Sequence, residues 1–165
     1  MRVLGIDPGT ICTGIGVVES DGRAYKSIYY GTAKNSSKWL FTRKFQNIYQ
    51  EIIKVIETYS PDCLAVEDIF YCKNFQSALR LGEARGVIIL AGATAEIPVW
   101  QYSPRKVKQA VVGYGNAHKT QVQKMVKSLL GLAEIPQPED AADALAIAIC
   151  HIQMSTGILQ EGKQL

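Results

Sequence analysis

Several features of secreted and membrane proteins are missing from this 165-residue sequence. No uninterrupted apolar run is long enough to span a bilayer. The short apolar run at the N-terminus contains the charged Asp7, so it does not resemble a signal peptide. The cysteines form neither a C-x-x-C pair nor a Cys/His zinc spacing. They are Cys12, Cys63, Cys72 and Cys150. These absences favour a protein of the reducing cytoplasm with free thiols and no membrane span.

Acidic residues are absent from two long stretches, residues 22–50 and residues 97–133. Each stretch contains six basic residues, so together they hold twelve of the 18 basic residues and none of the 15 acidic ones. This segregation suits a protein that binds a polyanion while it holds cations in a carboxylate pocket. Taken alone, either stretch is explained equally well by lysine-rich, solvated helix faces.

The order of predicted elements indicates one α/β domain over residues 1–155. Strands are expected over residues 2–7, 13–18, 24–30, 63–67 and 99–102, and the first three are separated by Pro-Gly and Asp-Gly turn signals. Apolar spacing predicts helices over residues 37–59 and 75–95, and further helices after residue 102. The expected sheet is five-stranded and mixed, with strands 1, 4 and 5 parallel, strands 2 and 3 antiparallel, and helices at its flanks. Residues 156–165 lack a clear period and are expected to form a flexible tail.

Four carboxylates are expected to meet at one edge of this sheet. Asp7 ends the first strand and Glu67 ends the fourth, and open α/β sheets bind ligands at the carboxyl ends of adjacent parallel strands. Asp140 and Asp143 lie one turn apart at the start of a helix, so both project from one face. The run after Asp143 is apolar nearly all round, so an aspartate there needs a cationic partner to offset its desolvation.

Each carboxylate also has an ordinary explanation. Asp7 could be a turn residue, Glu67 a solvated strand end, and Asp140 an acid stabilised by the helix dipole. Taken together, they predict a site for divalent cations, because oxygen-only ligands favour Mg²⁺ or Mn²⁺ over zinc. Two ions roughly 3.5–4 Å apart can hold the attacking water and the leaving oxygen of a phosphodiester, which predicts phosphodiester hydrolysis.

Five segments resemble, in the same order and at similar intervals, the RuvC family of Holliday junction resolvases. The segments are Gly-Ile-Asp-Pro-Gly-Thr at 5–10, Val-Glu-Asp-Ile-Phe at 66–70 with Lys73-Asn74, Ser-Ala-Leu-Arg-Leu-Gly-Glu-Ala-Arg-Gly at 77–86, Val-Lys-Gln-Ala-Val-Val-Gly at 107–113, and Asp-Ala-Ala-Asp-Ala-Leu-Ala at 140–146. The resemblance covers about residues 1–148. It implies an RNase H-like fold and a DNA endonuclease that makes paired cuts in junction strands of like polarity, leaving 5′-phosphate and 3′-hydroxyl ends.

The resemblance also implies roles for individual residues. It makes Asp7, Glu67, Asp140 and Asp143 the catalytic ligands of two Mg²⁺ ions, for which Mn²⁺ can substitute. Some relatives have histidine in place of Asp140, so that residue could bind metal directly or position the water.

By the same resemblance, basic and aromatic residues are expected to contact DNA. They are Phe70, Lys73, Arg105, Lys108 and Lys119. The two last lysines match residues that contact scissile-strand phosphates or stabilise the transition state. Phe70 matches an aromatic that stacks on an unpaired base at the junction centre. A solvated helix position for the lysines and a core position for Phe70 are the ordinary alternatives. Tyr71 and Cys72 depart from the family, which has smaller residues in this loop.

The resemblance implies a homodimer acting on four-way junction DNA, whose approximate two-fold symmetry would match the dimer. The dimer interface is expected on the helix over residues 75–95, where Gly82, Gly86 and Gly92 permit close approach of helices. Packing of the same helix within the chain is the alternative. The implied partners are the junction-binding protein RuvA and the branch-migration motor RuvB.

Three other functions remain open at this point. An ATP-binding protein of the sugar kinase, Hsp70 and actin superfamily also has Asp-x-Gly-Thr after its first strand, but this chain is too short for two such domains. A non-catalytic nucleic-acid-binding module on the same fold is disfavoured, because all four acids are present. A nuclease for other branched or RNA-containing substrates also fits the sequence.

Overall fold

The computed structural model describes residues 1–69, 74–156 and 163–165. The described residues form one mixed sheet with the strand order β3-β2-β1-β4-β5-β6. The strands are β1 (Arg2–Asp7), β2 (Cys12–Ser20), β3 (Tyr25–Lys34), β4 (Cys63–Glu67), β5 (Val99–Tyr102) and β6 (Lys163–Gln164). The helices are α1 (Phe41–Tyr59), α2 (Phe75–Thr94), α3 (Pro104–Val112), α4 (Lys119–Leu129) and α5 (Glu139–Thr156).

The predicted topology is confirmed for the first five strands. β1 is parallel to β4 and β4 to β5, whereas β2 is antiparallel to both β1 and β3. The strand count differs, because Lys163 and Gln164 form a short sixth strand antiparallel to β5. The Leu165 amide also donates a hydrogen bond of 2.9 Å to the Val99 carbonyl. These residues belong to the tail predicted to be flexible, of which residues 157–162 lie outside the described part.

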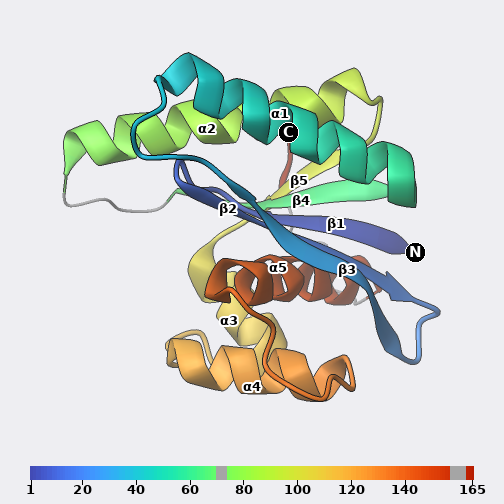
Figure 1. Ribbon diagram of the computed structural model, residues 1–165. Helices are drawn as coiled ribbons and strands as arrows, with labels where there is room; N and C mark the ends of the chain where they lie inside the picture. Colours follow the sequence, from blue (N-terminus) through green and yellow to red (C-terminus); the bar gives the residue numbers. More distant parts are fainter. Residues whose placement is uncertain (70–73, 157–162) are drawn as a thin grey trace.

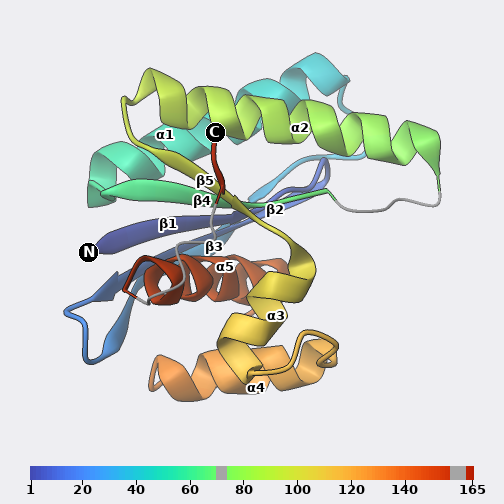
Figure 2. The same cartoon turned by 180° about the vertical axis from the view of Figure 1, so that it is seen from behind.

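Helices cover both faces of the sheet (Figures 1 and 2). α1 and α2 lie on one face, where α1 buries Ile48, Ile52, Val55 and Ile56 at helical spacing. α5 lies on the other face, with α3 and α4 packed against it on the side away from the sheet. The chain thus has one apolar core on each face of a central sheet.

The central helix α5 is almost completely enclosed. Every residue from Ala141 to Ile152 is buried except Asp143, which confirms the buried helix expected from the apolar run. Despite this apolar character, no helix among the described residues has the length and hydropathy needed to cross a membrane. Enclosing the charge of Asp143 in such surroundings costs free energy unless a cation or a hydrogen-bond donor lies next to it.

Glycines in the sheet allow α5 to approach the strands closely. A Cβ at Gly5 would lie 2.1 Å from the Ala144 carbonyl oxygen, and one at Gly14 would lie 2.0 Å from that of Asp140. Neither distance is possible for real atoms, so only glycine permits this packing. The backbone of α5 therefore rests directly on β1 and β2, with its first turns at the edge where β1 ends.

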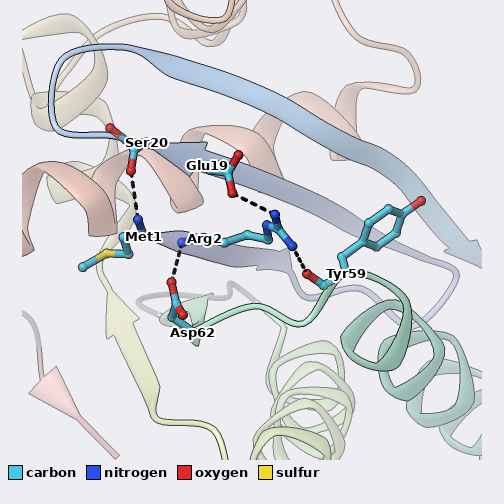
Figure 3. A network of polar contacts seen from close by, with 6 residues as sticks. All are labelled: Met1, Arg2, Glu19, Ser20, Tyr59 and Asp62. Atoms are coloured by element: carbon cyan, nitrogen blue, oxygen red, sulfur yellow. Dashed lines mark hydrogen bonds and ion pairs between the residues drawn. The ribbon is translucent and has the colours of Figure 1, made fainter.

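Hydrogen bonds tie the opposite edge of the sheet together (Figure 3). The Met1 ammonium donates to the last carbonyl of β2 at 2.8 Å, and the Arg2 amide donates to Asp62 at 2.6 Å. The Arg2 guanidinium donates to the Tyr59 carbonyl and forms an ion pair of 2.8 Å with Glu19. These contacts hold the starts of β1 and β4 in register, which also fixes where the two strands end.

Candidate active site

Asp7 and Glu67 stand side by side at the carboxyl ends of two parallel strands. The parallel register pairs Ile6 of β1 with Val66 of β4, so the next residue of each strand is a carboxylate. Both strands are buried up to these residues, and both carboxylates are themselves only half-buried. The expectation that the two strand ends meet is therefore confirmed.

Asp140 and Asp143 come to the same edge from the first turns of α5. Gly14, in β2 next to the end of β1, contacts the backbone of Asp140. Asp143 retains 27% exposure of its side chain on an otherwise buried helix. Asp140 lies close enough to Cys12 to raise the pKa of that thiol, after the larger effect of burial.

The proton affinities of the carboxylates show that their charges interact. Burial first, and then the charges of Glu67, Asp143 and Asp140, raise the pKa of Asp7 from 3.8 to about 8. Burial and then the charge of Asp143 raise the pKa of Glu67 from 4.5 to about 7, although Lys108 and Lys119 lower it. The charges of Glu67 and Asp143 act on Asp7, and that of Asp143 acts on Glu67, so these acids lie near one another and the site disfavours full ionisation in the absence of a cation.

Lys119 supplies a cation at this site. Its Nζ lies 2.8 Å from Asp143 Oδ2 and 3.2 Å from Glu139 Oε2. Burial lowers the pKa of Lys119, but the hydrogen bonds and charges of Asp143 and Glu139 outweigh burial and hold this pKa above its ordinary value. Burial raises the pKa of Asp143, and the Lys119 ammonium opposes the shift.

A cavity of about 230 Å³ opens beside these groups. Its lining includes Glu67, Asp143, Lys108 and Lys119 together with apolar residues of α3, α4 and α5. A larger cavity, of about 850 Å³, lies at the N-terminal ends of α1 and α2, where Phe41 is among its lining residues. None of the described residues lining this larger cavity is acidic, whereas the smaller one is lined by two of the four carboxylates, Glu67 and Asp143.

The donor set fits divalent metal ions. All four carboxylates offer oxygen ligands alone, which hard cations such as Mg²⁺ prefer. Among the residues the structure describes, no three acidic, histidine or cysteine side chains are already close enough to hold a metal ion. Asp143 is instead paired with the Lys119 ammonium. Burial is the largest cause of the raised pKa values of Asp7, Glu67 and Asp143, and neighbouring acids add to it, so a bound cation would favour the ionised carboxylates.

The residues expected to contact DNA fall into two groups. Lys108 and Lys119 lie at the carboxylates, as described above. Arg105 is exposed in the first turn of α3, and a Cβ at Gly115 would lie 2.7 Å from its Cγ, so its aliphatic part packs over that glycine. Phe70 and Lys73 lie outside the described residues, as do Tyr71 and Cys72 of the same loop.

Glu139 was missed by the sequence analysis. An acid in the first turn of a helix has an ordinary explanation in the helix dipole, so its sequence position alone gave no functional signal. A usable signal lay in its partner, because Lys119 is the first residue of α4, where the dipole disfavours a cation. Acidic neighbours offset this unfavourable interaction, and the structure supplies two.

Comparisons with known proteins show the family of this chain. The family model described as "Crossover junction endodeoxyribonuclease RuvC" matches residues 3–151. The protein of that name from Caldicellulosiruptor saccharolyticus is 49% identical over 162 residues, covering 98% of both chains. The one from Geobacter sulfurreducens is 52% identical over 151 residues, covering 92% of both.

Solved structures extend the comparison to three dimensions. T. thermophilus RuvC in complex with a Holliday junction substrate superposes with a TM-score of 0.94 at 35% identity, covering 100% of this chain and 99% of that one. The yeast mitochondrial Holliday junction resolvase Ydc2 shares the fold, with a TM-score of 0.64 at 12% identity over 90% of this chain and 77% of that one.

Proposed function

Because this chain belongs to the RuvC family of crossover junction endodeoxyribonucleases, we propose that its carboxylate edge is the site where Holliday junction strands are hydrolysed. The chain is a Holliday junction endonuclease, as the family match over residues 3–151 and the near-complete superposition on a junction-bound relative support. The RNase H-like fold of that family is confirmed as well. Neither an ATP-binding protein nor a non-catalytic module is supported.

One observation carries the assignment of the site. Glu67 and Asp143, from β4 and α5, line one cavity together with Lys108 and Lys119. After burial, the charges of Glu67 and Asp143 raise the pKa of Asp7 at the end of β1, so acids from three separate elements lie near one another. A purely structural arrangement would separate buried like charges, because each one adds to the cost of folding. Their convergence supports a role in binding cations and phosphate.

The proposed metal ligands are Asp7, Glu67, Asp140 and Asp143, with Mg²⁺ as the cation and Mn²⁺ as a possible substitute. Two ions held there would activate the attacking water and neutralise the leaving oxygen of the phosphodiester. β1, β4 and α5 hold the backbone of these residues at one end of the sheet, and their side chains would close on the ions as the ions bind. Asp140 would act in one of two ways, as a direct metal ligand or by positioning the water.

The lysines complement the carboxylates. Lys108 and Lys119 place positive charge at the cavity, where it can stabilise negative charge that develops on the phosphoryl oxygens. Arg105, together with Phe70 and Lys73 from the loop outside the described residues, is proposed to bind the DNA around the cut. Phosphate contacts of this kind set the position of the duplex rather than its sequence preference.

The exposed side of α2 supports the proposed homodimer. Phe75, Leu79 and Leu90 are large apolar residues with 80%, 51% and 57% exposure. A Cβ at Gly82 or Gly86 on the same helix would meet no described atom within 4 Å. An apolar surface with small residues at its centre permits close packing of a second copy. Gly92 is different, because a Cβ there would lie 2.5 Å from Val99, so that glycine serves packing within the chain.

RuvA and RuvB are proposed as physiological partners through membership of the family. The cytoplasm is the proposed compartment, which agrees with the free thiols of Cys12, Cys63 and Cys150 among the described residues.

Cleavage of synthetic DNA tests the proposal. The protein should cut a mobile four-way junction into nicked duplexes when Mg²⁺ is present, leave linear duplex intact, and hydrolyse no ATP. The Asp7→Asn variant should bind the junction with nearly wild-type affinity in a gel-shift assay but fail to cut it. Cleavage by that variant at the wild-type rate would remove Asp7 from the site, and preferential cutting of RNA-containing or flap substrates would replace the proposed substrate.

A further inference from the structure

Lys119 has two acceptors on one helix. Its Nζ lies 2.8 Å from Asp143 and 3.2 Å from Glu139. The two carboxylates are four residues apart in α5, so they project from the same face one turn apart. Asp143 belongs to the proposed metal-binding set, and Glu139 does not.

This arrangement places two demands on Asp143. A divalent cation that used Asp143 as a ligand would compete with the Lys119 ammonium for the same carboxylate oxygens. With no second acceptor, Lys119 would lose its partner whenever the cation bound. Its position at the first residue of α4 would then favour its departure to solvent, because the helix dipole repels a cation there.

We propose that Glu139 is a positioning residue that keeps Lys119 at the site when Asp143 serves the metal ions. The inference rests on the proposed two-metal function. Glu139 suits the task because it is the first residue of α5, where the helix dipole stabilises an acid, and its side chain is 60% exposed. It is thus the more solvated of the two acceptors, and it can retain Lys119 without joining the buried carboxylates.

The effect of removing Glu139 follows from the strength of exposed ion pairs. Such pairs change an equilibrium by about two- to fivefold, and Glu139 and Lys119 are both largely exposed. In Glu139→Gln, kcat for junction cleavage should fall by about that factor, while KM for the junction stays unchanged. The Kd for Mg²⁺ should rise by about the same factor, because Lys119 then has Asp143 as its remaining acceptor.

Metal binding gives a readout that is independent of turnover. Isothermal titration of the full-length, DNA-free protein with MgCl₂ should be run on the wild type, Glu139→Gln, Lys119→Ala and the double variant. Glu134→Gln is the matched control, because Glu134 is an exposed glutamate shortly before the same helix. The expected result is a weaker Kd in Glu139→Gln, no change in Glu134→Gln, and no further effect of Glu139→Gln once Lys119 is alanine.

Two outcomes would overturn the inference. An equal loss of Mg²⁺ affinity on adding Glu139→Gln to the Lys119→Ala background would mean that Glu139 acts through its own charge. Identical Kd and kcat values for Glu139→Gln and Glu134→Gln would mean that Glu139 has no role. Failure of the proposed function is distinguishable from both, because the wild type itself would then bind no Mg²⁺ or cut no junction.

Discussion

Replacing Asp7 by asparagine should make the metal-free protein more stable while abolishing its cleavage activity. Burial and the neighbouring acids raise the pKa of Asp7 from 3.8 to about 8, so the folded state at neutral pH has to take up a proton that the unfolded state does not bind. Each pKa unit corresponds to about 1.4 kcal/mol, which puts the cost at pH 7 at no more than about 4 kcal/mol. Asparagine keeps the shape without this cost.

The expected gain is smaller than that ceiling, because the asparagine amide must also be desolvated. We expect a gain of about 2 kcal/mol, which corresponds to a rise in Tm of roughly 4–8 °C for a chain of this size.

The sign of the pH dependence of stability follows from the raised pKa of Asp7. At Asp7 the folded protein binds more protons than the unfolded one between pH 3.8 and about 8, so the contribution of Asp7 to the stability of the wild type falls as pH rises through this window.

Thermal unfolding in EDTA measures this effect. His151 contributes the opposite trend below its ordinary pKa of 6.5, so the comparison belongs between pH 6.5 and 8. There the Tm of the wild type should decline with pH, and that of Asp7→Asn should decline less, since Glu67 still titrates. Adding Mg²⁺ should raise the Tm of the wild type much more than that of the variant. A lower Tm for Asp7→Asn in EDTA, or an equal response to Mg²⁺, would refute the reasoning.

Three further substitutions test other parts of the structure. Lys119→Ala should reduce the cleavage rate by at least about tenfold with little loss of junction affinity, because the lysine charge acts on the reacting phosphate. Single-turnover kinetics measure the rate and gel shifts the affinity; a small loss of rate with a large loss of affinity would mean that Lys119 only anchors DNA. Gly14→Ala should weaken Mg²⁺ binding measured by calorimetry, since a Cβ 2.0 Å from the Asp140 carbonyl oxygen must push the start of α5 away from the sheet. An unchanged Mg²⁺ affinity would contradict this close packing. His151→Ala should lower the free energy of unfolding in urea by about 2–3 kcal/mol, because the buried Tyr102 hydroxyl loses its partner, whereas cleavage per folded molecule should stay unchanged.

The sequence predicted most of the sheet and the adjacent strand ends that carry Asp7 and Glu67, because both follow from strong local patterns. The buried strand ending at Glu67 and the apolar run after Asp143 each combine a clear hydrophobic pattern with a polar residue at its boundary. The weaker signals failed at element ends. α1 begins at Phe41 rather than at residue 37, and its N-cap, Leu40, makes no side-chain hydrogen bond that a capping motif would reveal. β6 has two residues and no period to detect.

Contacts between distant charges could not be predicted in the same way. The pairing of Lys119 with Glu139 depends on where α4 ends up relative to α5, and the two residues are separated by a loop with prolines and glycine. The hydrogen bonds of His151 to Tyr102 and Cys63 likewise join three elements. Such contacts depend on tertiary packing, which residue spacing within one element does not encode.

The two ends of α5 show how the fold tolerates a costly site. Toward the C-terminal end, burial lowers the pKa of His151 to about 4, so the imidazole is neutral at physiological pH. Its two ring nitrogens form hydrogen bonds of 2.8 Å with the Tyr102 hydroxyl and 3.1 Å with the Cys63 thiol. At the start of the helix, Asp143 belongs to a group of mutually repelling acids. Both residues lie on one continuous buried helix. The packing of its apolar middle and the hydrogen bonds of His151 therefore hold the start of α5 in place, despite the repulsion between Asp143 and the neighbouring acids. Neutralising a charge at the start of α5 should therefore stabilise the metal-free chain, whereas shortening the His151 side chain should destabilise it. Residues that limit activity and residues that provide stability thus lie at different ends of this helix.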